Sequence, residues 1–221
     1  MFIKHFLVTL LIFLWANYVF AQSEKVSEVV EDVRGIHTFE FQIHKDLKPY
    51  IFKLYGNKSN HIGKIEIIIK GKTAPFQSIT TTTTTTQSPY KRAKYFEVLD
   101  MNFDGYKDIK LLEWWGVTGN KGYRCWLYAP NKKKFIFHKE LSELGNPRIN
   151  HAEQTIRTSY NGGGGLYALH IWAFENGKLV CVEGTLQDYD KDKQHYIVIK
   201  NKRINGKIVE VERKIVKEKT Y

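Results

Sequence analysis

Oxygen-bearing side chains alternate along residues 100–108, which read Asp-Met-Asn-Phe-Asp-Gly-Tyr-Lys-Asp. Glycine at the sixth position permits a sharp bend, so the alternate side chains can point inward together. A hard cation such as Ca²⁺ takes about six to eight oxygen ligands, which such a loop can supply. We therefore predict a calcium site formed by Asp100, Asn102, Asp104, the backbone carbonyl of Tyr106, and Asp108. A turn without metal is the alternative, because Asp, Asn and Gly favour turns in any case.

The segments on both sides of this loop read as strands. Residues 95–99 precede it and residues 109–115 follow it, and both are rich in apolar and aromatic side chains. An EF-hand would place helices here and a bidentate Glu at its twelfth position, where this chain has Leu111. The predicted site therefore lies between two strands.

Apolar and polar residues alternate with a period of two in many other segments, as in residues 38–44. Residues 195–203 and 207–216 flank Asn205-Gly206, which is a strong hairpin signal. No segment of the chain after residue 21 shows a sustained helical period. The sequence predicts one all-β domain over residues 35–221, built from antiparallel hairpins laid side by side.

The first 21 residues have the features of a secretory signal peptide: a short basic start, an apolar core, and small residues in Val19-Phe-Ala21. An uncleaved anchor is the alternative. With cleavage, residues 22–34 become a flexible arm, and the protein is periplasmic or secreted with no stable membrane anchor. The net charge of +11 then falls to +10, because Lys4 is removed. An exported chain should not meet nucleic acid, so the positive charge indicates attraction to anionic envelope polymers or simply solubility.

Two cysteines, Cys125 and Cys181, are present. In an oxidising compartment they could form a disulfide, and two separate buried thiols are the alternative.

We find no catalytic motif in the sequence. There is neither a Gly-x-Ser-x-Gly elbow nor a His-Glu-x-x-His pair, and the glycine run is not followed by the Lys-Ser/Thr of a phosphate loop. Glu113 stands beside Trp114 and Trp115 and could be a glycosidase carboxylate, but a cross-strand ion pair is the more common role. We therefore expect no enzyme activity.

Four consecutive glycines, residues 162–165, lie between two predicted strands. They fit a flexible hairpin loop. They also fit a protruding loop that enters the cleft of a partner protein, since glycine lets a backbone approach closely and tyrosine supplies rigid contact area. The candidate contact residues are Tyr160, Gly163, Gly164 and Tyr167.

Five segments in order carry a resemblance to a known family. They are the loop at 100–108, Trp-Leu-Tyr-Ala-Pro at 126–130, Leu-x-x-Leu-Gly-Asn-Pro at 141–147, the glycine run, and Trp-x-x-x-x-Gly-Lys-Leu at 172–179. The chain resembles exported bacterial β-proteins with a single FG-GAP/VCBS-like calcium loop. These include periplasmic immunity proteins against peptidoglycan hydrolases and are similar to inhibitors of invertebrate-type lysozyme. The resemblance covers about residues 50–183 and implies that the hairpins adopt a propeller-like or lysozyme-inhibitor-like arrangement in a single domain. It implies an inhibitory Ser-Gly-x-x-Tyr loop, of which Gly164 and Tyr167 match, whereas Gly163 replaces the Ser.

These observations support two functional hypotheses. The first is a non-catalytic, calcium-binding protein that inhibits a cell-wall hydrolase. The second is an envelope module that binds an anionic glycan through its basic surface and four tryptophans, Trp114, Trp115, Trp126 and Trp172. Tryptophans exposed in one groove would favour the glycan, and buried tryptophans with a protruding glycine loop would favour inhibition.

Overall fold

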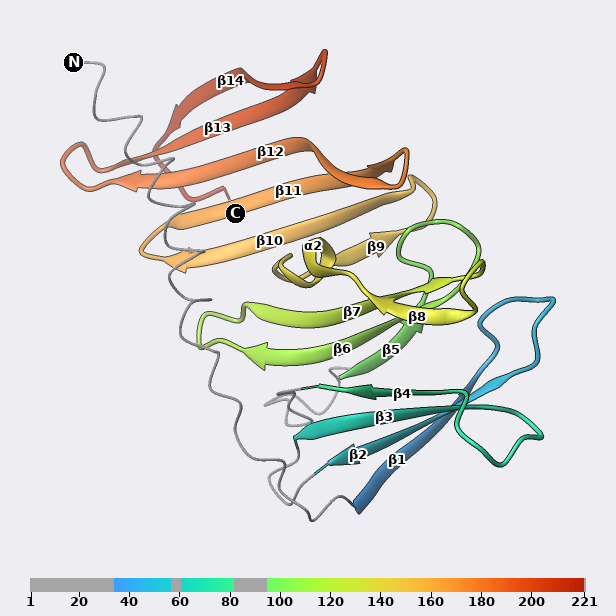
Figure 1. The fold of residues 1–221 in the computed structure, drawn as a ribbon. Coiled ribbons are helices and arrows are strands. Elements are labelled where there is room, and N and C mark those ends of the chain that lie inside the picture. Colours follow the sequence, from blue (N-terminus) through green and yellow to red (C-terminus); the bar gives the residue numbers. More distant parts are fainter. Residues whose placement is uncertain (1–33, 57–60, 82–94, 221) are drawn as a thin grey trace. The chain divides into compact units, whose positions relative to one another are not determined.

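Three antiparallel sheets follow one another along the chain (Figure 1). The computed structural model describes residues 34–56, 61–81 and 95–220. All the described strands belong to one compact unit, Val33–Tyr221. The predicted all-β class is therefore confirmed. The predicted signal peptide lies outside the described residues, and so does the predicted arm except for Arg34, where the first strand already begins.

The first sheet is a meander in the order β1-β2-β3-β4. Its second strand alternates buried and half-buried residues, so that Tyr50, Phe52 and Leu54 face the core. The four strands are β1 (Arg34–Phe41), β2 (Tyr50–Gly56), β3 (Ile62–Ile69) and β4 (Gln77–Thr80).

The second sheet is another meander, in the order β5-β6-β7-β8, and the loop at residues 100–108 connects its first two strands. A short helix, α2 (Lys139–Ser142), follows it. His138 caps this helix, because its Nδ1 accepts a hydrogen bond from the Leu141 backbone N–H at 3.2 Å. The four strands are β5 (Phe96–Leu99), β6 (Asp108–Trp115), β7 (Lys121–Ala129) and β8 (Lys134–Phe137).

The third sheet has six strands in the order β14-β13-β12-β11-β10-β9. Asn205 and Gly206 both have positive φ, at 50° and 79°, which fits the tight hairpin that the sequence predicts between the last two strands. The strands are β9 (Arg148–Asn150), β10 (Thr155–Gly163), β11 (Leu166–Glu175), β12 (Lys178–Asp190), β13 (His195–Ile204) and β14 (Lys207–Val216).

Strand β14 is an edge strand. Among the described strands it pairs with β13 alone, and eight of its ten residues are exposed. Its exposed side chains include apolar residues as well as charged ones. The apolar ones are Ile208, Val209, Val211 and Ile215.

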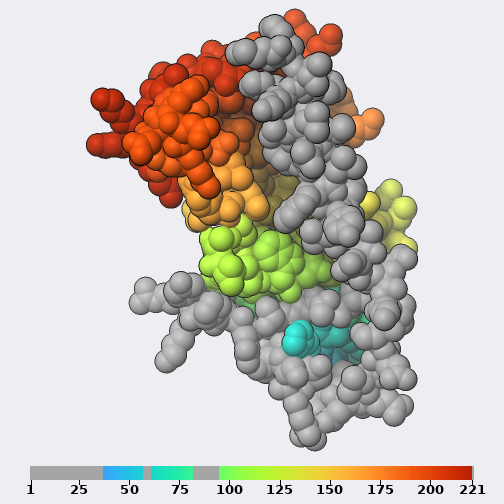
Figure 2. Space-filling view, turned by 90° about the vertical axis from the view of Figure 1, so that its left-hand side faces the viewer, coloured from blue at the N-terminus to red at the C-terminus, as the bar shows by residue number. Residues whose placement is uncertain are grey.

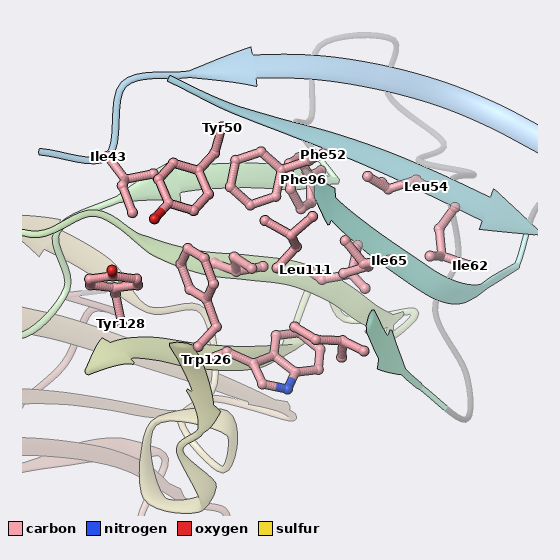
Figure 3. Packing of buried hydrophobic residues seen from close by; sticks show 14 residues of the cluster. Ile43, Tyr50, Phe52, Leu54, Ile62, Ile65, Phe96, Leu111, Trp126 and Tyr128 are labelled. Atoms are coloured by element: carbon pink, nitrogen blue, oxygen red, sulfur yellow. The ribbon is translucent and has the colours of Figure 1, made fainter. Parts of the chain in front are cut away.

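Two clusters of buried side chains hold the sheets together. The first lies between the first and second sheets, where Phe52 and Leu54 approach Leu111 and Trp126 (Figure 3). The second cluster joins β6, β7 and α2 to the third sheet, and its members are Met101, Leu112, Tyr123, Cys125, Leu141, Leu144 and Ile156. Over the described residues, no helix has the length and apolar character that a membrane crossing requires.

Candidate functional site

Asp100 fixes the shape of the predicted calcium loop. Its Oδ1 accepts hydrogen bonds from the backbone N–H groups of Phe103, at 2.7 Å, and Asp104, at 3.2 Å. Its Oδ2 accepts from the N–H of Gly105 at 2.9 Å. Phe103 and Gly105 both have positive φ, which sends the chain back over Asp100. The loop is therefore a tight turn around one carboxylate.

Asn102 and Asp104 lie side by side in this turn. The Asn102 amide donates to Asp104 Oδ2 at 3.0 Å, while Asp104 Oδ1 accepts from the Tyr106 N–H at 2.9 Å. The Oδ1 atom of Asn102 is buried and has no hydrogen-bond partner among the described residues. An unpartnered buried oxygen is costly, so this atom fits a cation bound in the turn.

Asp108 has a different environment, since it is fully buried at the start of β6. Its Oδ2 accepts from the Met101 N–H at 2.7 Å, and its Oδ1 accepts from the Tyr128 N–H at 2.9 Å. Burial raises the pKa of Asp108 to about 8; the two N–H groups oppose this, and the charges of Asp104 and Asp100 add to it. Asp108 thus ties the loop to β7, whatever else it binds.

The loop also contacts the connection between β1 and β2 in the first sheet. The Lys107 N–H donates to the Ile43 carbonyl at 2.8 Å, and the Tyr106 ring stacks on His44 at a centroid distance of 4.2 Å. Within the described residues, no group of three or more His, Cys, Asp or Glu side chains is arranged as a metal site. The donor set that fits a cation is therefore mixed: Asn102 Oδ1 with the neighbouring carboxylates of Asp100 and Asp104.

The glycine run forms the turn between β10 and β11. Gly163, Gly164 and Gly165 all have positive φ, a conformation that glycine adopts at low cost. A Cβ at Gly165 would lie 2.7 Å from Tyr189 Cβ, and a Cβ at Gly162 would lie 2.7 Å from Leu166 Cδ2. A Cβ at Gly163 or Gly164 would meet nothing within 4 Å. The base of the turn is packed, and its tip is bare backbone.

The two tyrosines near this turn lie on opposite faces of the hairpin. Tyr160 pairs with Ala168, whereas Tyr167 pairs with Asn161, and directly paired residues share a face. Tyr160 is 50% exposed, and Tyr167 is half-buried. The sequence hypothesis placed Tyr160 and Tyr167 in one contact surface. With the two side chains on opposite faces, a partner could contact both only by enclosing the tip of the hairpin.

The tryptophans do not line one exposed groove. Trp126 is buried in the first core cluster, and Trp172 donates from its Nε1 to Thr158 Oγ1 at 3.0 Å. The Trp115 ring is covered by the Lys121 ammonium at 3.9 Å, and Trp114 is exposed beside Gly122.

Glu113 and Arg124 form a cross-strand ion pair between β6 and β7, with 2.9 Å between Oε1 and Nε. The ion-pair interpretation of Glu113 is therefore confirmed.

Both cysteines are free thiols, so the structure does not support the disulfide hypothesis. Cys125 is buried in β7 and Cys181 is half-buried in β12, so they belong to different sheets. Burial raises the pKa of Cys125 to about 12, which makes it an unreactive thiol.

The structure contains a cavity of about 490 Å³ that the sequence did not predict. It lies where the second and third sheets meet, and three cationic residues, Lys110, Lys121 and Arg148, line it together with one carboxylate, Glu97. These residues come from β5, β6, β7 and β9, so no local motif could have revealed them. The excess of basic over acidic residues in the composition was a weak sequence signal for a cationic site.

One wall of this cavity is a network of three asparagines that joins the two sheets. The Asn120 side chain exchanges two hydrogen bonds of 2.9 Å with the backbone of Asn161. Asn146 accepts from the Lys121 N–H through its Oδ1 and donates its own backbone N–H to the Lys121 carbonyl, both at 2.9 Å. In Figure 2 the light green surface of the second sheet borders the yellow and orange surface of the third. Side-chain amides thus replace strand pairing at this junction.

Together, the fold and the loop define an antiparallel three-sheet protein with an aspartate-rich turn between the first two strands of its second sheet. A similar fold is found in a solved chain described as "Structure of a Xanthomonas Type IV Secretion System related protein". The TM-score is 0.59 at 14% sequence identity, and the match covers 79% of this chain and 98% of that chain. Likeness at this identity shows the fold alone. No protein family and no curated protein matched the chain.

Proposed function

We propose that this chain is an exported, non-catalytic, calcium-binding protein that inhibits a peptidoglycan hydrolase. The observation that carries the proposal is the β10–β11 turn, whose base is packed while Gly163 and Gly164 present bare backbone. A backbone without side chains can enter a narrow cleft, and a fixed base lowers the entropy lost on binding.

The base of the β10–β11 turn is held by hydrogen bonds to one residue of β12 and one residue of β10. The Gly165 carbonyl accepts a hydrogen bond from the Gln187 amide at 3.2 Å, and the Gly163 N–H donates to Asn161 Oδ1 at 3.1 Å. Asn161 is in turn held by Asn120 of the second sheet. These contacts favour a preorganised tip rather than a loose loop.

Calcium would have a structural role in this proposal. Asp100, Asn102 and Asp104 would hold the ion, and its charge would offset the repulsion between neighbouring carboxylates. Because the loop contacts β7 and the Ile43–His44 segment, a filled loop would stiffen the region between the first two sheets.

Two further points support the proposal. The fold resembles that of a protein described as related to a type IV secretion system, which suits an exported chain. The second hypothesis, a glycan-binding module, has less support because the tryptophans do not share one exposed groove.

The test begins with a pull-down of envelope hydrolases by the protein that starts at Gln22, followed by an inhibition assay. We expect Tyr160→Ala and Tyr167→Ala each to weaken inhibition about thirtyfold, as truncation of a central interface tyrosine commonly does. Phe137→Ala is the control, because Phe137 is a comparably exposed aromatic residue, at 44%, in another sheet. Wild-type inhibition by both tyrosine variants would overturn the proposed contact, and capture of no hydrolase would overturn the proposed function.

A further inference from the structure

We propose that the cavity between the second and third sheets binds an oxyanion, either the carboxylate of an acidic sugar or a phosphate group. This inference goes beyond hydrolase inhibition and does not depend on the glycine turn or the calcium loop. It rests on the distribution of charge and hydrogen bonds around the cavity.

Lys110 is the cation of the cavity that already has an anionic partner. Its ammonium contacts Glu97 Oε1 at 3.0 Å and the Pro147 carbonyl at 3.2 Å, and it lies 4.3 Å from the centre of the Tyr123 ring. The Lys110 side chain is only 7% exposed. Glu97 is therefore paired with Lys110, and this one carboxylate cannot balance all three cations of the cavity.

Lys121 and Arg148 are the cations without a carboxylate partner. The Lys121 ammonium lies over the Trp115 ring at 3.9 Å. Among the described residues, neither Lys121 nor Arg148 forms an ion pair with a carboxylate. Burial lowers the pKa of Lys121, the charges of Arg148 and Lys110 lower it further, and the charge of Glu97 opposes this. The cavity therefore holds three positive charges against one negative charge.

The strand register adds a second, independent observation. Arg148 of β9 pairs directly with Arg157 of β10, so two exposed guanidinium groups stand on the same face of neighbouring strands. Like charges in directly opposite positions destabilise a sheet. An anion bound beside Arg148 would relieve this repulsion.

The size and shape of the cavity define the ligand class. A volume of about 490 Å³ is that of a small-molecule site, large enough for one or two sugar units. Thr118, Gly119 and Arg148 are exposed at its edge, so a ligand can enter from solvent. Guanidinium binds carboxylate and phosphate through paired hydrogen bonds, and the asparagine wall can bond to hydroxyl groups.

Calorimetric titration of the full mature chain with D-glucuronate, inorganic phosphate and neutral D-glucose tests the inference at low salt. We expect saturable binding of glucuronate, phosphate or both, and none of glucose. Binding of glucuronate alone would identify an acidic sugar as the source of the anion, and binding of phosphate alone would identify a phosphate group. Saturation by neither anion, or equal binding of glucose, would overturn the inference.

Variants locate the binding. Lys121→Met keeps an unbranched side chain on the Trp115 ring, and Arg148→Gln changes an exposed residue, so both should fold, which their melting temperatures will check. Each should weaken anion binding about tenfold, because a charge-assisted hydrogen bond is lost. Lys178→Met, at the exposed start of β12, removes the same charge elsewhere and should have no effect. Equal binding by wild type, Lys121→Met and Arg148→Gln would also overturn the inference.

Discussion

Asp104 and Asp108 belong to the same loop but have different partners, so their substitutions should have different consequences. Asp104 is exposed, and its acceptors serve the turn itself. Asp108 is buried, and each of its oxygens accepts a backbone N–H. We therefore expect any metal binding to depend chiefly on Asp104 and tertiary structure to depend chiefly on Asp108.

The first prediction concerns calcium and stability. Wild type should melt at a higher temperature in millimolar calcium than in chelator, since an ion at a hundredfold excess over Kd adds about 2.7 kcal/mol to the free energy of unfolding. Asp104→Ala should lose this calcium-dependent shift, with little change in chelator. Asp108→Asn should be less stable by about 1–3 kcal/mol even in chelator, because an amide cannot accept both N–H bonds.

Asp192→Ala is the matched control for charge, because Asp192 is an exposed aspartate in the β12–β13 turn. It should keep the full calcium shift. A calcium shift of the same size in Asp104→Ala would contradict the assignment of this loop as the metal site.

The sequence could indicate that residues 100–108 form a turn, because the spacing of their side chains is local, and the metal site there stays a prediction. It could not predict that Asp108 faces inward, because the Tyr128 N–H that it binds is twenty residues further along the chain. The same reason applies to Asn102, whose unpartnered oxygen depends on how the finished turn is buried.

At the scale of elements, the helix α2 depends on one capping side chain. His138 accepts the Leu141 N–H through its Nδ1, which requires a neutral imidazole. Burial lowers the pKa of His138 from its ordinary value of 6.5, and the Glu140 carboxylate only partly opposes this. Burial also lowers the pKa of His170.

The second prediction is that His138 and His170 destabilise the fold as the pH falls below 6.5. The unfolded chain binds protons at the ordinary histidine pKa, whereas these two side chains resist protonation in the folded chain, so at these two sites the unfolded state holds more protons. Asp108, whose pKa is raised to about 8, acts in the opposite direction between pH 8 and pH 5. The contribution of His138 is therefore the difference in the free energy of unfolding between wild type and His138→Asn, measured by denaturant titration, and this difference should decrease as the pH is lowered from 8 to 5.

His138→Asn should keep the cap and weaken this pH dependence, because asparagine also accepts the N–H bond. His138→Ala should lower the free energy of unfolding by about 1 kcal/mol at pH 8, where the cap of wild type is intact. An unchanged pH slope in His138→Asn would show that His138 does not contribute to it.

Strands with strong local signals could be read from the sequence, and weak ones could not. The Asn205-Gly206 hairpin is an example of the first kind, because the turn residues alone select it. Strands β4 and β9 and helix α2 have three or four residues each, too few to show a period. Their existence depends on pairing and packing with residues distant in sequence.

At the scale of the whole molecule, the junction of the second and third sheets is held by side chains rather than by a shared strand pair. Asn120 alone makes four hydrogen bonds there, to Thr118 Oγ1, to the carbonyl and N–H of Asn161, and to the amide of Asn146. The cavity beside this junction could not be predicted, because its lining comes from five separate strands and their connections.

The third prediction is that Asn120→Ala loosens this junction. It should lower the free energy of unfolding by about 1–3 kcal/mol, since buried partners lose their hydrogen bonds. Amide hydrogen exchange should rise at Asn161 and along β10 more than in β2 and β3, because the first sheet does not contact Asn120.

Thr118→Ala is the control, because it removes just one of the four bonds. It should change exchange only slightly. A uniform rise in exchange over all three sheets of Asn120→Ala would show that the junction and the rest of the protein unfold together.

The edge strand β14 has a consequence for handling the protein in solution. Its outer backbone groups face no other described strand, and an open edge with apolar side chains can recruit a strand from another copy. Charged side chains lie between the apolar ones on this strand, including Lys207, Glu210, Arg213 and Lys214. Electrostatic repulsion between two copies of the protein opposes their association, but only at low salt, where the charges are not screened. At 1 M salt the screening length shrinks to about 3 Å. Colloidal stability should therefore be better in dilute buffer, and filaments or gels should form first in concentrated salt.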